Sequence, residues 1–186
     1  LGMATLFKHP LQDEYLAIPA ERGRSSFAAV SEDEVELWQH VHRRFQHVSV
    51  ERVLSGPGLQ VMYEAICEIK GVAIERIPSP SEITELGVSN QCFICSQVVN
   101  YFCRILGTTA SNLACITSAF GGVYIGGGIV PKILDYFLKS DFRCRFEDKG
   151  RLRKYLENIP VYVIKHQFPA FLGVSYALDT LINKGY

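Results

Sequence analysis

The 186-residue sequence has no excess of charge of either sign, since 19 Lys and Arg residues balance 19 Asp and Glu residues. A net charge of zero gives no indication of a nucleic-acid-binding surface. No apolar run approaches the roughly 18 residues that a membrane-spanning helix needs. The first residues, Leu1-Gly2-Met3-Ala4-Thr5, lack the charged region and apolar core of a signal peptide. We therefore expect a cytoplasmic globular domain, with neither membrane nor nucleic acid among its partners.

The sequence is also poor in metal-ligand patterns. Of its six cysteines, only Cys92 and Cys95 have a suggestive spacing, Cys-x-x-Cys. A zinc site would need a second such pair or histidines at ligand spacing, and neither is nearby. We expect no metal site and interpret the cysteines as reduced structural thiols, with a redox or metal role for this pair as the alternative.

Residues 120–131, Phe-Gly-Gly-Val-Tyr-Ile-Gly-Gly-Gly-Ile-Val-Pro, form the most informative stretch. They predict a tight turn, a short apolar strand, three glycines and a helix that Pro131 opens. Glycines let the backbone approach a ligand, and a helix N-terminus suits an anionic group. The stretch is neither a G-x-G-x-x-G motif nor a P-loop. From these residues alone, a ligand-binding turn and an ordinary strand-to-helix turn are about equally favoured.

Apolar periodicity and turn residues predict the order of the elements. Capping boxes predict that helices begin after Ser31 and after Ser79, with Glu34 and Glu82 as the reciprocal acceptors. His42, on the first of these helices, is expected to pack against the core. The other expected elements are a hairpin of strands 3–7 and 15–18, a helix from Pro57, a central buried helix 89–118, a helix 131–139, a charged loop 141–150, a helix 151–157, a buried strand 161–164 and a helix from Pro169. The alternation of strands and helices in the second half indicates an α/β fold.

Four stretches together resemble the bacterial ATP-dependent glucokinases of the hexokinase/actin-like ATPase superfamily. They are Glu-Arg-Val-Leu-Ser-Gly-Pro-Gly-Leu at 51–59, the glycine-rich stretch at 121–131, Phe-Glu-Asp-Lys-Gly-Arg at 146–151 and Ile-Pro-Val-Tyr at 159–162. The resemblance runs nearly end to end. It implies an α/β actin-like, ribonuclease H-like ATPase domain with a mixed sheet and flanking helices.

The resemblance also implies how the chain is organised. Residues 1–186 would be a single domain, the large C-terminal domain of the family, with a helical insertion at roughly 31–88. The family's small N-terminal domain, which holds a phosphate loop and the aspartate base, would lie upstream of Leu1. We therefore expect the chain to be part of a longer polypeptide, with no catalytic residue of its own, and the isolated chain to be inactive.

The sugar contacts implied by the resemblance are Glu21 and Glu51, together with Gly23 in the same loop as Glu21. An ionised carboxylate accepts hydrogen bonds from two hydroxyl groups, which suits a polyol such as glucose. Within the loop Pro-Ala-Glu-Arg-Gly-Arg at 19–24, Arg24 stands where the family has a histidine. Arg22 stands where it has a small residue. The sugar preference is accordingly open.

The resemblance places Gly126, Gly127 and Gly128 at the adenosine side of a nucleotide, which favours the ligand-binding interpretation of that turn. It implies that Mg²⁺ and ATP are the cofactors, that glucose and ATP are the partners, and that the protein is a homodimer. The implied reaction is phosphorylation of glucose to glucose 6-phosphate, the first step of glycolysis. Two alternatives remain. One is a non-catalytic sugar- or nucleotide-responsive regulator, motivated by Arg22 and Arg24, and the other is a dimerisation domain that uses helix 89–118.

Overall fold

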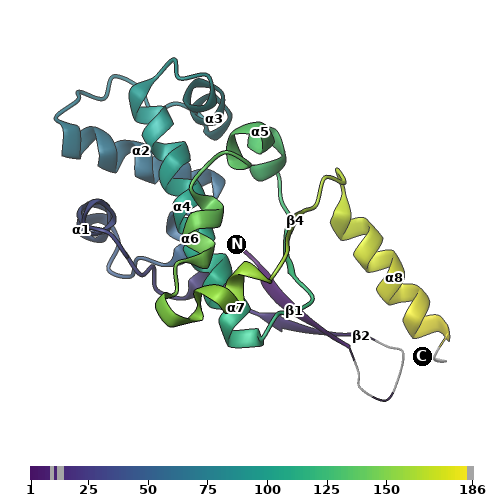
Figure 1. Ribbon diagram of the computed structural model, residues 1–186. Coiled ribbons are helices and arrows are strands. Elements are labelled where there is room, and N and C mark those ends of the chain that lie inside the picture. Colours follow the sequence, from purple (N-terminus) through teal and green to yellow (C-terminus); the bar gives the residue numbers. More distant parts are fainter. Residues whose placement is uncertain (9–10, 12–14, 184–186) are drawn as a thin grey trace.

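The computed structural model describes residues 1–8, 11 and 15–183, and its centre is the 25-residue helix α4 (Phe93–Thr117). Helices α2 (Gly56–Lys70), α3 (Pro80–Val88) and α6 (Phe142–Glu147) pack against it, and α1 (Glu32–Arg44) packs on α2 (Figure 1). The predicted central buried helix is confirmed. Its neighbours cover α4 on several sides, and Phe93 and Ile116 near its two ends stay exposed.

A glycine lets α6 lie close to α4. A methyl group on Gly107 would sit 2.5 Å from the carbonyl oxygen of Phe142. Only a residue without a Cβ allows this approach. The close packing in turn buries Phe142 and Phe146, which are four residues apart on one face of α6.

The strands form two separate pairs among the described residues. Strands β1 (Met3–Lys8) and β2 (Tyr15–Ala20) are antiparallel, with Met3 opposite Ala20. The predicted hairpin is thus confirmed, although most of its connection lies outside the described residues. Strands β3 (Val123–Ile125) and β4 (Val161–Val163) are parallel, with Val123 opposite Val161. Antiparallel and parallel pairing thus both occur, as expected, but in two separate two-stranded sheets rather than in one mixed sheet.

The two predicted capping boxes have different outcomes. At the start of α3, Ser79 Oγ accepts the N–H of Glu82 at 3.3 Å and Glu82 accepts the N–H of Ser79 at 2.7 Å, as expected. At the start of α1, Ser31 makes no side-chain cap. Glu34 is fully buried there and accepts from the N–H of Val30 instead. The box at Ser31 was wrongly predicted because Arg104 donates a hydrogen bond to Ser31 Oγ and Arg145 forms an ion pair with Glu34.

Three further expectations need correction. His42 does not pack against the core; it is exposed and stacks on Trp38 with ring centroids 4.5 Å apart. The expected helix 131–139 is a 3₁₀ turn (Val130–Ile133) followed by the four-residue α5 (Leu134–Phe137). The expected charged loop contains α6, because its charged residues are interleaved with core-facing aromatic ones. A 3₁₀ turn (Gly150–Leu152) then leads into α7 (Arg153–Glu157).

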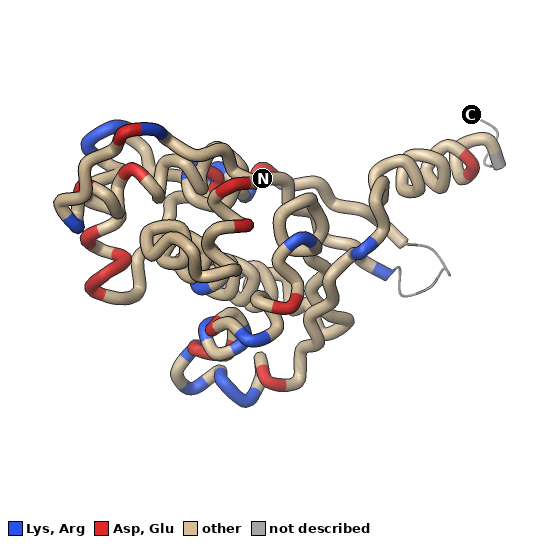
Figure 2. The backbone as a smooth tube through the Cα atoms, turned by 90° about the horizontal axis from the view of Figure 1, so that it is seen from above, with Lys and Arg blue, Asp and Glu red and all other residues tan. Residues whose placement is uncertain are grey.

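Helix α8 (Pro169–Asn183) projects away from the helical body on the same side as the β1–β2 hairpin (Figure 1). Its apolar side chains, such as Phe171 and Tyr176, are exposed. Figure 2 shows that charged residues gather over the helical body, whereas α8 carries only Asp179. None of the helices in the described part of the chain has the length and apolar character needed to cross a bilayer.

Candidate functional site

Two pockets meet at the N-terminus of α2. The larger, which we call the Glu51 pocket, has a cavity volume of about 760 Å³ and is lined by Arg24, Ser49, Glu51 and Arg52 among others. The smaller, which we call the glycine pocket, has a volume of about 310 Å³ and is lined by residues that include Leu1, Leu54, Phe102, Gly126, Gly127 and Gly128. Ser55 lines both pockets. Ligands in the two pockets would therefore be neighbours.

The turn before α2 fixes the position of Glu51. Residues Val50–Arg52 form a 3₁₀ turn, and Ser55 is the N-cap of α2. Ser55 Oγ donates to the Glu51 carbonyl oxygen at 2.8 Å and accepts from the N–H of Gly58 at 3.0 Å. A methyl group on Gly58 would lie 2.8 Å from the carbonyl carbon of Val53, so glycine is required there. The Ser-Gly-Pro-Gly sequence thus ties the helix start to the residue that carries the carboxylate.

The carboxylate of Glu51 lies in a positively charged setting. Arg24 and Arg52 line the same pocket as this carboxylate. A carboxylate that stays ionised is a strong acceptor for hydroxyl groups.

The second predicted sugar ligand, Glu21, precedes the 3₁₀ turn Arg22–Arg24 and is exposed. Its Oε2 lies 3.8 Å from Nε of Arg24, which lines the Glu51 pocket although Glu21 itself does not. Gly23 is buried under Leu1, where a methyl group would overlap the Leu1 carbonyl oxygen. The structure therefore places Arg24 in the pocket with Glu51 and leaves Glu21 on its solvent side.

A short backbone ladder joins the two loops. Ser26 pairs with Ser49 in an antiparallel bridge. The N–H of Val50 donates to the Ser25 carbonyl at 2.9 Å, and the N–H of Phe27 donates to the Val48 carbonyl at 2.8 Å. Because of this pairing, the loop that bears Glu21 and the turn that bears Glu51 are held side by side.

Two of the three glycines after β3, Gly127 and Gly128, face open space. Gly127 has φ +115°, which L side chains rarely adopt, and a methyl group on Gly127 or Gly128 would meet nothing within 4 Å. The backbone is therefore accessible to a flat ligand. The expected helix dipole is not available here, because the helix that follows has only four residues. Accessible glycine backbone, rather than a helix N-terminus, is what this turn offers.

The sequence interpretation missed part of the Glu51 pocket. Arg44, His47 and Arg52 line it from the end of α1 and the loop that follows. The guanidinium of Arg52 lies over the Phe45 ring at 4.1 Å, and Arg44 pairs with Glu64. These residues are scattered basic positions with no motif of their own. Only the fold brings them to one cavity.

Three of the cysteines, Cys67, Cys95 and Cys103, are buried as structural thiols are. All six are free, and Cys92 Sγ accepts from the N–H of Cys95 at 3.4 Å. Burial, together with the hydrogen bond to Cys92, raises the pKa of Cys95 to about 12. Such a thiol is a poor nucleophile. No group of three His, Cys, Asp or Glu side chains that could hold a metal ion occurs among residues 1–8, 11 and 15–183.

Comparison with known proteins identifies the family. The sequence profile of the glucokinase family matches residues 1–181, and the chain therefore belongs to this family. It is 46% identical over 165 residues to a glucokinase of Neisseria meningitidis and 43% identical over 166 residues to one of Campylobacter jejuni subsp. doylei. Each alignment covers 89% of this chain and 50% of the relative. The chain thus spans about half the length of the curated relatives it matches.

Solved structures agree. A glucokinase from an Antarctic psychrotroph superimposes with a TM-score of 0.82 at 31% identity, over 89% of this chain and 51% of that one. A glucokinase from Balamuthia mandrillaris in complex with glucose superimposes with a TM-score of 0.77 at 20% identity, over 87% of this chain and 46% of that one. The expected α/β ATPase-like fold is confirmed by these neighbours.

Proposed function

We propose that this chain is the large C-terminal domain of a glucokinase, which transfers the terminal phosphoryl group of ATP to the 6-hydroxyl of D-glucose in the cytoplasm, as the first step of glycolysis. The observation that carries the proposal is the junction of the two pockets at Ser55. Phosphoryl transfer depends mainly on holding acceptor and donor in line and stabilising charge. Two adjoining pockets suit that task. Membership of the glucokinase family supports the same reaction.

In this proposal Glu51 and Glu21 accept hydrogen bonds from sugar hydroxyls. Gly23 keeps the loop between them thin enough to pack under Leu1. The Glu51 pocket, at about 760 Å³, lies within the range of roughly 300–1,000 Å³ typical of small-molecule sites. A hexose would fill only part of this pocket, so the side chain of Arg24 can occupy the same pocket beside it.

The glycine pocket would take the nucleotide, with its adenosine side against Gly126, Gly127 and Gly128. Mg²⁺ would accompany ATP and neutralise its phosphates. The described residues supply no group of three His, Cys, Asp or Glu side chains that could hold this ion. The general base and the phosphate loop are proposed to belong to the other half of the protein, and the isolated chain is expected to be inactive.

We propose that residues 1–186 form one domain with a helical insertion at about 31–88, which corresponds to α1–α3 on one side of α4 (Figure 1). We also propose that the complete protein is a homodimer. Native mass spectrometry of the full-length polypeptide at low micromolar concentration tests the oligomeric state. A mass of one chain would contradict the dimer.

The proposal is tested by assaying ATP-dependent phosphorylation of glucose, with mannose and fructose alongside, on the full-length polypeptide that contains this chain. Product from glucose supports the kinase. The isolated 186-residue chain serves as the matched control, and steady turnover by that chain would contradict its expected inactivity.

A non-catalytic sugar-responsive regulator of the same fold is the second candidate, because Arg24 lies in the Glu51 pocket where the family pattern has histidine. Binding of glucose by the folded full-length protein, without product from any of the three hexoses, would favour the regulator.

A further inference from the structure

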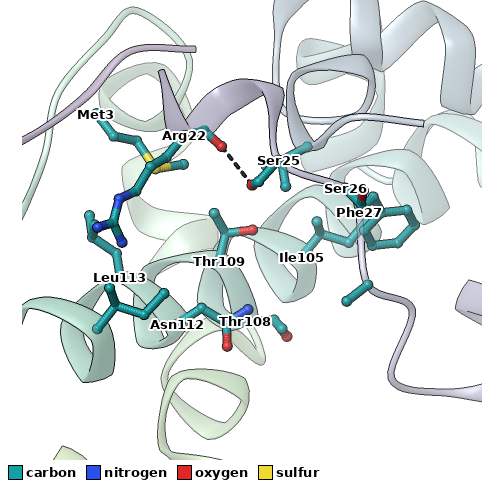
Figure 3. Close-up of a pocket in the computed structure, with 13 residues that line it drawn as sticks. Met3, Arg22, Ser25, Ser26, Phe27, Ile105, Thr108, Thr109, Asn112 and Leu113 are labelled. Carbon is teal, nitrogen blue, oxygen red and sulfur yellow. Dashed lines mark hydrogen bonds between the residues drawn. The ribbon is translucent and has the colours of Figure 1, made fainter. Parts of the chain in front are cut away.

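A third cavity lies beneath the loop that bears Glu21, on the face opposite to the Glu51 pocket. It has a volume of about 220 Å³ and separates residues 22–28 from α4, and we call it the α4 cavity. Met3, Arg22 and Phe27 line it from one side, and Ile105, Thr109 and Leu113 line it from α4 (Figure 3). Neither the sugar nor the nucleotide of the proposed reaction would occupy it.

The chemistry of the α4 cavity is defined by Arg22. This residue is half-buried, and its guanidinium makes no ion pair or side-chain hydrogen bond with any residue in the described part of the chain. Figure 3 shows its side chain running along the cavity towards Leu113, with Met3 beside it. A half-buried arginine with no carboxylate partner among the described residues favours an anionic ligand, because its guanidinium can donate two parallel hydrogen bonds to such a group.

The rest of the lining is mainly apolar, with hydroxyl and amide groups at one side. Phe27, Val50 and Ile105 form the buried floor. Thr109 and Asn112 project from α4, and their side chains make no hydrogen bond to other described residues. At roughly 30 Å³ per water-sized group, the cavity takes on the order of seven or eight non-hydrogen atoms.

We propose that the α4 cavity binds a small monocarboxylate with an aliphatic tail of about five carbons. Arg22 donates two parallel hydrogen bonds to the carboxylate, in the geometry that guanidinium and carboxylate groups prefer. The tail lies against Phe27, Ile105 and Leu113. The cavity is too small for a hexose–nucleotide ligand, and Arg22 is the one cation among its described lining residues, which disfavours a polyanion.

The α4 cavity shares a wall with the Glu51 pocket. Val50 lines the first, whereas the next residue, Glu51, lines the second. Ser26 lines the first and contacts Nε2 of His47, which lines the second, at 3.2 Å. The bridge between Ser26 and Ser49 makes the wall one unit. A ligand on Arg22 would therefore alter the affinity of the Glu51 pocket for sugar, and this second part rests on the proposed function.

Calorimetric titration of the full-length protein with hexanoate tests the binding, with acetate and hexan-1-ol as probes that keep only the head group or only the tail. We expect hexanoate to bind at least about tenfold more tightly than either probe. Hexan-1-ol lacks the charge-assisted hydrogen bonds, which contribute on that scale, and acetate lacks the apolar tail. Equal affinity for hexan-1-ol and hexanoate would overturn the proposal.

Arg22→Gln should weaken hexanoate binding about tenfold, while Arg24→Gln, in the same loop but outside the α4 cavity, should leave it within twofold. Thr109→Leu, which fills the cavity and leaves Arg22 in place, should abolish hexanoate binding. This variant tests the site even if Arg22→Gln does not fold. Unchanged hexanoate affinity in Thr109→Leu or in folded Arg22→Gln would contradict the site.

Saturating hexanoate should change the dissociation constant for glucose at least twofold in the wild-type protein and not in Arg22→Gln. An unchanged constant would overturn the coupling. If the kinase proposal is wrong, glucose is not phosphorylated, whether or not hexanoate binds.

Discussion

Glu34 and Arg145, 111 residues apart, form a buried ion pair in which Nη2 of the arginine lies 2.9 and 3.1 Å from the two carboxylate oxygens. Arg145 also donates to Thr108 Oγ1. A second guanidinium, that of Arg104, lies 3.5 Å from Glu34 and pairs with Asp33 at 2.6 Å. Helices α1, α4 and α6 are therefore joined through one buried carboxylate.

Glu34→Gln should destabilise the protein by about 3 kcal/mol, because removing one partner of a buried ion pair leaves the remaining charges uncompensated. Urea unfolding of the full-length protein measures this loss. Glu32→Gln, an exposed glutamate in the same helical turn, should change stability by less than about 0.5 kcal/mol. Equal effects of the two substitutions would show that the buried pair is not a stabilising contact.

Glu82 should make the folded state less stable as the pH falls into the acid range. Hydrogen bonds from Arg76 and from the N–H and side chain of Ser79 lower the pKa of Glu82 from its ordinary 4.5 to about 2. A carboxyl group whose pKa is lower in the folded than in the unfolded protein stabilises the folded state at pH values above its unfolded pKa. This contribution is lost as the pH falls through the folded pKa. Glu82→Gln should therefore flatten the fall of the melting temperature between pH 4.5 and about 2. Glu75→Gln, an exposed loop glutamate, should leave the profile as in the wild type.

Two glycine substitutions in helices should have opposite signs. Gly107→Ala should cost about 1–3 kcal/mol, because its methyl group would force α6 away from α4. Gly173→Ala in α8, where a methyl group meets nothing within 4 Å, should be neutral or stabilise by up to about 1 kcal/mol through helix propensity. Thermal unfolding of both variants provides the measurement. A stable Gly107→Ala variant would mean that the two helices can separate without loss.

Within the proposed kinase, Glu51→Gln should lower kcat/KM for glucose by about 10- to 100-fold, the range for losing hydrogen bonds to a charged acceptor. Glu21→Gln should have a smaller effect, because Glu21 is exposed and lies outside the Glu51 pocket. The KM for ATP should stay within twofold in both. Initial rates against glucose and ATP separate these parameters. A larger loss in Glu21→Gln would reverse the assigned order of importance.

Gly127→Ala should raise the KM for ATP several-fold, since the added methyl group projects into the open glycine pocket and the φ of +115° is strained for alanine. The KM for glucose should not change. Gly121→Ala, in open space at a glycine before β3, is the matched control. If both variants have the same KM for ATP as the wild type, the glycine turn does not contact the nucleotide.

Local patterns were predictable from the sequence where neighbouring residues complete them. The Ser79–Glu82 capping box formed as expected because both partners lie within one helical turn. The pattern at Ser31 failed because Arg104 and Arg145, far away in sequence, bind its side chains. Helix α6 was missed since its charged residues masked the spacing of Phe142 and Phe146.

The sequence by itself determined the family, the central helix, the strand segments and the positions of Glu51 and the three glycines, because these depend on short motifs and on apolar periodicity. Only the tertiary structure decided which side chains share a cavity. It placed Arg24, His47 and Arg52 beside Glu51 and left Glu21 facing solvent. It also put Arg22 against α4, where none of the described carboxylates pairs with it. Such groupings depend on how distant segments pack, and the spacing of residues along the chain does not predict this packing.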